Sequence, residues 1–138
     1  MREILFRGKR VGSEEWVEGF YLTSPEFDNQ EVAVITTDKP RNPYYVSKET
    51  IGQYTGLTDK NGKKIFEGDI VKLYLEVPYL PSQLKKISAV GVVEFNTEKS
   101  SYYVVSASGE EYALCFIDEV IGNIHDNPEL LKESDNDE

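Results

Sequence analysis

The sequence predicts a mainly β protein, and three observations support that fold class. Aromatic residues make up 12% of the 138 residues, with nine Tyr and six Phe, and such side chains fit the half-buried surface of a sheet. Short apolar runs recur along the chain between Gly, Pro, Asn and Asp, which is typical of strands joined by turns. The hydrophobic fraction of 39% and the charged fraction of 29% are those of a globular chain. At this length we expect one domain with a core.

Five short strands are predicted in the N-terminal part. The run "EWVEGFYLT" carries apolar groups on both faces, and Gly19 within it indicates a bulge or a close backbone approach. The run "VAVITT" is continuously apolar or β-branched and predicts a buried strand. Two prolines in "DKPRNP" mark a loop, because proline cannot continue a sheet ladder. The predicted strands cover residues 2–10, 15–23, 32–37, 44–46 and 51–54.

The stretch "TGLTDKNGKKIFEGDIVKL" (residues 55–73) concentrates the acids, lysines, Asn and Gly that binding loops use. Asn61 and Gly62 both tolerate positive φ, which a tight hairpin turn requires. Apolar residues lie on either side of this polar tip, so residues 57–66 predict a hairpin. A second turn follows at residues 67–69. We therefore interpret the stretch as a device for turning the chain, with positive φ at Gly62.

The C-terminal part predicts a meander. A strand follows the turn at Asp69, residues 78–86 form a loop bounded by prolines, and strands follow at 88–96, 100–108, 110–117 and 119–127. Pro128 after Asn127 predicts the start of a short C-terminal helix. The layout of residues 69–121 predicts a small five-stranded SH3-like barrel, preceded by additional N-terminal strands. In this fold we expect four buried side chains: Trp16, Ile70, Val92 and Phe95.

Charge and cysteine content bear on partners and compartment. The formal net charge is −10, and residues 126–138, with six acids against Lys132, carry −5 of it. Residues 132–138 predict a flexible acidic tail. A net basic footprint, which nucleic-acid binders usually show, is absent, so the charge disfavours nucleic acid as a partner. No run is long and apolar enough for a membrane span or a signal peptide. Cys115, in the apolar run "EYALCFI", is expected to be a buried thiol, and a cytoplasmic location is expected.

No residue set in the sequence predicts catalysis, a cofactor or a metal. One Cys and one His cannot form a zinc cluster. Asp59, Glu67 and Asp69 could hold a divalent cation, but intruding lysines favour a solvated hairpin tip. Cys115 and His125 are the only pair with the chemistry of a nucleophile and base. We favour a structural thiol and a surface histidine in a C-terminal turn, and expect no enzyme.

Two clusters interleave aromatic and basic side chains, "RNPYY" (residues 41–45) and "YLEVPYLPSQLKK" (residues 74–86). Aromatic rings beside cations can hold single-stranded nucleic acid. The favoured interpretation is that the tyrosines pack a small barrel while the lysines solvate a loop. If the protein has an interaction surface, we expect it in these segments, at Arg41, Tyr44, Tyr45, Tyr79, Lys85 and Lys86.

Four blocks of the chain resemble the YopX family of phage and prophage proteins. They are "FRGKR…EWVEG" (6–19), "IGQYTGLTDKNGKKIFEGDIV" (51–71), "GVVEF" (91–95) and "VIGNIHDNPELL" (120–131). The blocks occur in the family's order, and the segments at 24–45 and 77–89 diverge. The resemblance implies a single YopX-like domain over residues 1–131, a mainly β fold with an SH3-like barrel, and a phage or prophage gene expressed in a bacterial cytoplasm. It implies no catalytic residues.

These observations lead to a non-enzymatic interaction module that binds an unidentified host or phage protein. Two alternatives stay open: a nucleic-acid-binding SH3-like barrel, and an acidic mimic of nucleic acid that occupies a host DNA-binding protein. No membrane partner is expected. Homo-oligomerisation is also open, because small β modules with exposed edges often pair.

Overall fold

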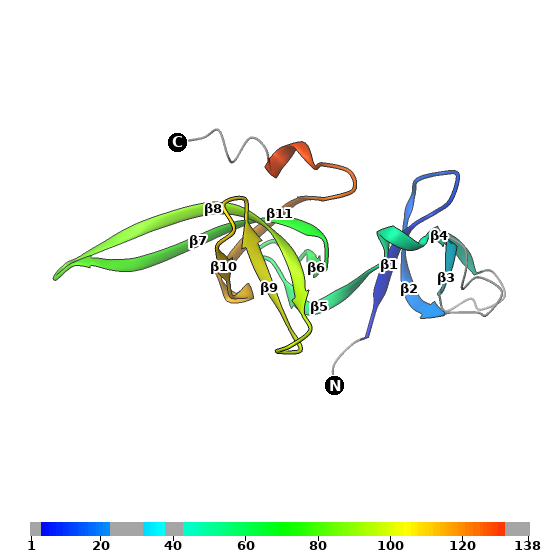
Figure 1. The fold of residues 1–138 in the computed structure, drawn as a ribbon, viewed down its shortest axis with the longest axis horizontal. Coiled ribbons are helices and arrows are strands. Elements are labelled where there is room, and N and C mark those ends of the chain that lie inside the picture. Colours follow the sequence, from blue (N-terminus) through cyan, green and yellow to red (C-terminus); the bar gives the residue numbers. More distant parts are fainter. Residues whose placement is uncertain (1–3, 23–31, 38–42, 132–138) are drawn as a thin grey trace. The chain divides into compact units, whose positions relative to one another are not determined.

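The computed structural model describes residues 4–22, 32–37 and 43–131, and the predicted acidic tail at 132–138 lies outside these residues. The chain packs into two compact units, residues 1–56 and 57–138. Both consist mainly of antiparallel strands (Figure 1), which confirms the mainly β prediction. The single domain over residues 1–131 stays a prediction. No helix in the described part of the chain is long and apolar enough to span a bilayer.

The strands of the first unit belong to a six-stranded sheet with the order β4-β3-β2-β1-β5-β6, of which β6 (Lys64–Phe66) is in the second unit. The apolar core of the first unit consists of Ala33, Ile35 and Val46. Gly19 on β2 makes the predicted close approach, because an added Cβ would lie 2.2 Å from the carbonyl oxygen of Thr36. The strands are β1 (Phe6–Lys9), β2 (Trp16–Leu22), β3 (Val32–Thr36), β4 (Tyr44–Ser47) and β5 (Gly52–Thr58), with a 3-10 turn η2 (Lys48–Thr50) before β5.

The second unit contains β6 and a five-stranded sheet with the order β10-β9-β8-β7-β11. The predicted meander from β7 to β10 is confirmed, and β11 returns to pair with β7. The sheet ends at β10 on one edge and β11 on the other, so a closed SH3-like barrel is not shown. The elements are β6 (Lys64–Phe66), β7 (Asp69–Leu80), β8 (Gln83–Asn96), β9 (Ser101–Ser106), β10 (Glu111–Tyr112), η3 (Leu114–Phe116) and β11 (Ile117–Asn123).

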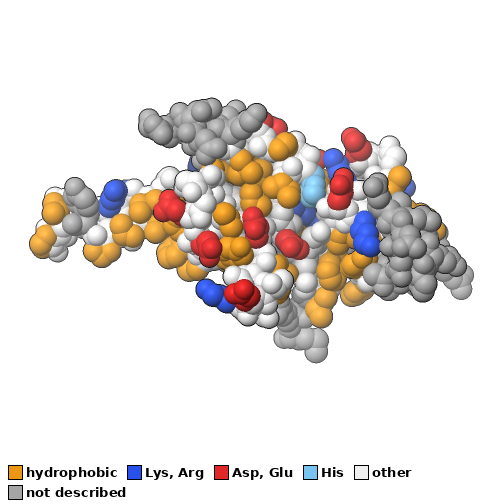
Figure 2. Space-filling view, viewed as in Figure 1, with side chains coloured by type: hydrophobic (Ala, Val, Ile, Leu, Met, Phe, Trp, Pro, Cys, Tyr) orange, Lys and Arg blue, Asp and Glu red, His pale blue; other side chains and the backbone are white. Residues whose placement is uncertain are grey.

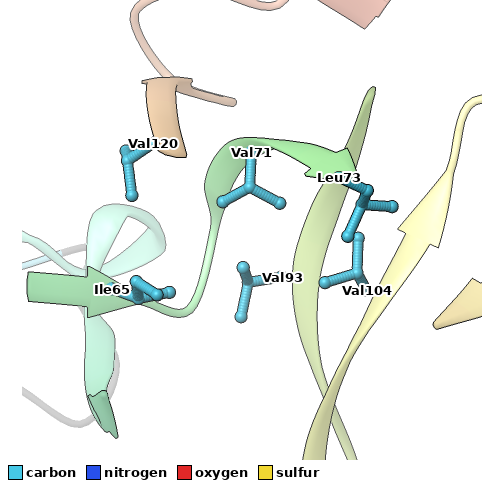
Figure 3. Packing of buried hydrophobic residues seen from close by; sticks show 6 residues of the cluster. All are labelled: Ile65, Val71, Leu73, Val93, Val104 and Val120. Atoms are coloured by element: carbon cyan, nitrogen blue, oxygen red, sulfur yellow. The ribbon is translucent and has the colours of Figure 1, made fainter. Parts of the chain in front are cut away.

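The core of the second unit lies on one face of the five-stranded sheet. Six buried side chains from β6, β7, β8, β9 and β11 point toward one another (Figure 3): Ile65, Val71, Leu73, Val93, Val104 and Val120. The C-terminal helix begins as predicted, since the N–H of Leu131 donates to the carbonyl oxygen of Pro128 at 3.3 Å. Residues 129–131 are helical, and the described chain ends there.

The loop predicted at residues 78–86 is wrong. These residues continue β7 and β8, which pair without interruption to Pro78 and Leu84 and again at Leu80 and Gln83. Proline is tolerated there because β11 pairs with β7 only as far as Leu73. The far edge of β7 therefore has no ladder for Pro78 to interrupt.

Three of the four burial predictions are also wrong. Ile70 is fully buried as expected, but Trp16 and Val92 are half-buried and Phe95 is 39% exposed. Trp16 faces cations on β1, with the Arg7 guanidinium 4.8 Å from the ring centre. Phe95 lies near the end of β8 and packs edge-on against Tyr102. The alternation of apolar and polar residues places these residues on strands. It does not show which part of each strand face is covered by other elements.

The strand predicted at residues 110–117 is shorter than expected, and this changes the state of Cys115. The chain pairs only at Glu111 and Tyr112 and then enters the 3-10 turn η3. Cys115 lies in the middle of that turn and is exposed, so the prediction of a buried thiol is wrong. None of the three residues of this turn is buried, and Phe116 is also exposed, so this apolar run does not form a strand of the core.

Candidate functional site

The hairpin at residues 57–66 uses its polar side chains to hold its own backbone. Oδ1 of Asp59 accepts hydrogen bonds from the N–H groups of Asn61 and Lys63, both at 2.9 Å. The N–H of Gly62 donates to the carbonyl oxygen of Asp59 at 3.0 Å, and φ of Gly62 is +80°, which confirms the predicted turn. Asn61 has no positive φ, so Gly62 alone supplies the left-handed residue.

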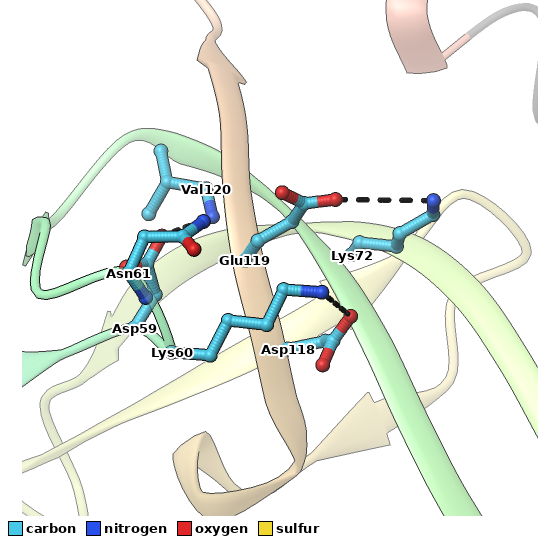
Figure 4. Close-up of polar contacts among 7 residues, drawn as sticks. All are labelled: Asp59, Lys60, Asn61, Lys72, Asp118, Glu119 and Val120. Carbon is cyan, nitrogen blue, oxygen red and sulfur yellow. Dashed lines mark hydrogen bonds and ion pairs between the residues drawn. The ribbon is translucent and has the colours of Figure 1, made fainter.

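The same carboxylate ties the hairpin to a distant strand. Oδ2 of Asp59 accepts the N–H of Val120 on β11 at 2.9 Å, although 61 residues separate the two. Next to it, Lys60 Nζ lies 2.9 Å from Asp118 Oδ2, and Lys72 Nζ lies 3.9 Å from Glu119 Oε1 (Figure 4). The carboxylate is occupied by three backbone donors, and both neighbouring acids face lysines. This polar cluster therefore fixes the hairpin against β11.

Neither of the two chemical sites considered from the sequence is assembled. Among the described residues, no group of three or more His, Cys, Asp or Glu is placed to hold a metal ion. Asp69 is buried, and its Oδ2 accepts the N–H of Phe66 at 2.8 Å in the turn before β7. Cys115 precedes β11 and His125 follows it. A seven-residue strand is about 20 Å long, far beyond the reach of a nucleophile and its base.

The stability of the hairpin should depend on pH through Asp59. The pKa of the Asp59 carboxyl is lowered from its ordinary value, mainly because the N–H of Val120 donates to the carboxylate, with further lowering from the N–H groups of Lys63 and Asn61. Burial acts in the opposite direction. A carboxylate with a lowered folded-state pKa stabilises the protein above its unfolded pKa, near 4, and loses that contribution as pH falls through the folded value.

We therefore expect the difference in free energy of unfolding between wild type and Asp59→Asn to be constant above about pH 5 and to shrink below about pH 4. Urea unfolding of both proteins across this range measures it. Taking the difference removes the contribution of the other acids. A difference that stays the same down to about pH 3 would contradict the role of the ionised carboxylate.

The outer half of the β7–β8 hairpin is largely exposed. β11 pairs with β7 only over residues 69–73, and β9 pairs with β8 only over residues 91–96. Among the described residues, those at 74–88, which we call the arm, pair only within the hairpin, and they extend away from the sheet (Figure 1). Hydrophobic side chains lie along the arm (Figure 2), and Leu80 and Leu84 at its tip are 50% and 59% exposed.

The arm has two different faces. Leu75 pairs with Ile87 and Val77 with Lys85, and these side chains lie on the face that Leu73 and Val71 use in the core. Leu75, Val77 and Ile87 are half-buried, so the apolar stripe of the core continues into solvent. The opposite face is polar at the base of the arm, where Tyr74 donates to Glu76 at 2.9 Å and Glu76 pairs across the strands with Lys86. Toward the tip, Pro78 pairs with the exposed Leu84 on that face. The arm is thus amphipathic at its base and carries apolar side chains on both faces toward its tip.

The arm also differs in charge from the rest of the chain. Its charged residues are Glu76, Lys85 and Lys86, so its net charge is +1. The rest of the chain has a net charge of −11, which gives the total of −10. Both lysines are exposed. An apolar face with a positive edge suits a partner whose surface is apolar and acidic.

The residues predicted to form one interaction surface fall into separate places. Tyr44 and Tyr45 lie on β4 of the first unit, whereas Lys85 and Lys86 lie on the arm of the second. Arg41 lies outside the described residues, and for Tyr79 the structure describes only the backbone, in β7. The surface itself stays a prediction. The apolar residues of the arm were missed, although the alternation in "YLEV" and "LKKIS" signals them.

Cations also lie over aromatic rings in the first unit. Trp16 has the Arg7 guanidinium 4.8 Å and Lys9 Nζ 6.0 Å from its ring centre. The Arg10 guanidinium lies 4.9 Å from the ring centre of Tyr44. The cation over Tyr44 comes from the residue after β1, and the predicted neighbour Arg41 lies outside the described residues.

Two of the comparisons with known proteins find a similar protein or family. The family model described as YopX protein matches residues 5–132. A solved structure, the crystal structure of protein EF1440 from Enterococcus faecalis, superposes with a TM-score of 0.56 at 23% identity. The superposition covers 95% of this chain and 99% of that chain, so it shows a shared fold. No curated protein matches.

Proposed function

Because this chain belongs to the YopX protein family, we propose that it is a non-enzymatic interaction module, encoded by a phage or prophage, that binds a protein in the bacterial cytoplasm. The binding element is the arm, residues 74–88. The resemblance to the family is the ground for proposing a phage origin, and the proposed binding element is argued from the residues of the chain itself.

The observation that supports this function most is that the apolar face of β7 and β8 continues beyond the core into the exposed arm. Leu73 is fully buried, while Leu75, Val77 and Ile87 on the same face are only half-buried. A two-stranded ribbon is at best marginally stable in water without a surface that covers its apolar face. A protein surface that covers these side chains would stabilise the arm and gain affinity from burying them.

The polar side chains support a role without catalysis. The carboxylates of Asp59 and Asp69 accept backbone N–H groups, and Asp118 and Glu119 face lysines. Each of these acids has a structural role that accounts for its position. Cys115 and His125 lie beyond opposite ends of β11.

A matched pair of variants tests the proposed function. Ile87→Asp places a charge on the apolar face of the arm, and Ser88→Asp places the same charge on the polar face one residue away. We expect tagged wild-type protein to hold one bacterial protein from lysate, Ser88→Asp to hold it equally, and Ile87→Asp to lose at least about tenfold in yield. Mass spectrometry of the captured protein provides the measurement. Equal capture by both variants, or no protein above background with wild type, would contradict the proposal.

The cation–aromatic stacks of the first unit favour a second candidate function, binding of single-stranded nucleic acid. Trp16 and Tyr44 offer rings for base stacking, and Arg7, Lys9 and Arg10 offer charge for phosphates. The net charge of −10 opposes it. Fluorescence anisotropy with labelled RNA and single-stranded DNA at low salt tests it, with Trp16→Ala as the comparison. No change in anisotropy for either nucleic acid would remove this candidate.

A further inference from the structure

The tip of the hairpin at residues 57–66 carries a chemically labile peptide bond. Asn61 is followed by Gly62, and no other asparagine of the chain precedes a glycine. Asparagine is one of the thermolabile residues, and glycine leaves the nitrogen that follows it without a Cβ to hinder a close approach. Both residues are exposed, and a Cβ added at Gly62 would meet no described atom within 4 Å apart from its chain neighbours. Water therefore reaches this peptide.

In the folded hairpin, Asp59 holds this peptide in place. The N–H of Gly62 donates to the carbonyl oxygen of Asp59 at 3.0 Å. Oδ1 of Asp59 accepts the N–H groups of Asn61 and Lys63, each at 2.9 Å, so the peptides on both sides are fixed as well. The carboxylate is negative at neutral pH because its pKa is lowered, first by the N–H of Val120. A negative charge near Gly62 opposes loss of the proton from its nitrogen.

We propose that Asn61 is a site of spontaneous deamidation that Asp59 protects, and that deamidation there loosens the hairpin from β11. The deprotonated nitrogen of Gly62 attacks Cγ of Asn61 and forms a succinimide ring, and the side-chain amide leaves as ammonia with a proton from water. Water then opens the ring. Breaking the ring bond at Cγ gives aspartate, and breaking it at the backbone carbonyl carbon gives isoaspartate. The net reaction consumes water and releases ammonia, so it needs no other reactant.

The isoaspartate product changes the backbone that Asp59 holds. In isoaspartate the chain runs through the former side chain, which adds a methylene to the backbone before Gly62. The donors of Gly62 and Lys63 follow this insertion, whereas their acceptor precedes it. Hydrogen bonds weaken steeply when distance and angle change, so Asp59 loses donors that fix its carboxylate. The same carboxylate accepts the N–H of Val120 (Figure 4), and deamidation thus weakens the bond between the hairpin and β11.

Deamidation rates of the full chain test the protection, with peptide mapping by mass spectrometry after incubation at mildly alkaline pH. We expect folded wild type to react at Asn61 about a hundredfold more slowly than the same chain unfolded in urea, and folded Asp59→Ala at least about tenfold faster than folded wild type. Asp118→Asn removes a charge from the same cluster and should react at the wild-type rate. Circular dichroism checks that each variant keeps its strands, and Asp59→Asn replaces Asp59→Ala if the latter does not fold.

The effect on the hairpin is measured by urea unfolding of aged protein. Wild type that has accumulated isoaspartate should unfold at a lower urea concentration than fresh wild type. Asn61→Gln aged in the same way should not change, because the longer side chain closes a ring far more slowly. Equal rates in the folded and unfolded chain, or a wild-type rate in the Asp59 variant, would overturn the protection. An unchanged unfolding midpoint with isoaspartate present would overturn the loosening. None of these outcomes involves the arm, so the capture experiment is decided independently.

Discussion

Replacing Asp59 by alanine should lower the free energy of unfolding by about 3 kcal/mol, the cost of leaving backbone donors without their acceptor. The carboxylate accepts three N–H groups at 2.9 Å. The donor of Val120 is within a buried strand pair and cannot be hydrated without opening the structure. Those of Asn61 and Lys63 lie at an exposed turn, where water replaces part of the loss. Urea unfolding at neutral pH measures the change.

Two further variants divide this loss. In Asp59→Asn, the amide oxygen can keep the bonds to Asn61 and Lys63, but its NH₂ group faces the donor of Val120. We expect about 2 kcal/mol, most of the alanine effect, if the bridge to β11 dominates. Asp118→Asn removes a charge from the same cluster at the surface and should leave stability little changed. Equal losses for Asp59→Ala and Asp118→Asn would mean that charge, and not the backbone acceptor, holds the hairpin.

Local chemistry allowed much of the fold to be predicted from the sequence. The turn at Asn61 and Gly62 depends on residues only a few positions apart, and so do the turn before Asp69 and the strand positions along the chain. The bond from Val120 to Asp59 joins residues 61 positions apart. Nothing in the neighbourhood of either residue signals it, so Asp59 was seen as a solvated turn residue, whereas it is buried.

The wrong burial predictions have a common physical cause: the sequence does not show which parts of a sheet are covered by other elements. Alternation assigns side chains to the two faces of a strand, but burial depends on which neighbours lie over each face. Phe95 follows Val93 on the core face and still emerges near the end of β8. Leu75 follows Leu73 in the same way on β7 and emerges where β11 stops pairing. A sequence pattern continues smoothly across both points, and only the three-dimensional pairing shows where the body of the sheet ends.

The arm was placed in the right segment but given the wrong form. Pro78 and Pro81 indicate a loop by the general rule that proline interrupts ladders. In the part of the chain that the structure describes, the edge of β7 beyond Leu73 has no partner strand, and the connection after Leu80 is a turn, so neither proline interrupts a ladder there. The basic residues of the segment were recognised, whereas its apolar stripe was not, because a loop has no faces.

Leu73→Ala and Leu75→Ala should have opposite effects on stability and on association. Leu73 is fully buried and belongs to the core, so its truncation should cost about 3 kcal/mol in unfolding free energy. Leu75 has the same chemistry on the same face, two residues further along, and is half-buried. Its truncation should cost below about 1 kcal/mol.

Association should show the reverse order. Leu75→Ala removes apolar area from the arm and should weaken capture of the bacterial protein, whereas Leu73→Ala should leave capture by the folded protein close to wild type. Urea unfolding and affinity capture from lysate with the same two proteins measure both quantities. If Leu75→Ala lost stability as strongly as Leu73→Ala, the arm would be part of the core and would not be available to a partner. If it changed neither quantity, the apolar stripe beyond Leu73 would have no role in binding. The prediction therefore locates the boundary between the structural and the functional part of one continuous strand pair at the residue where β11 stops pairing with β7.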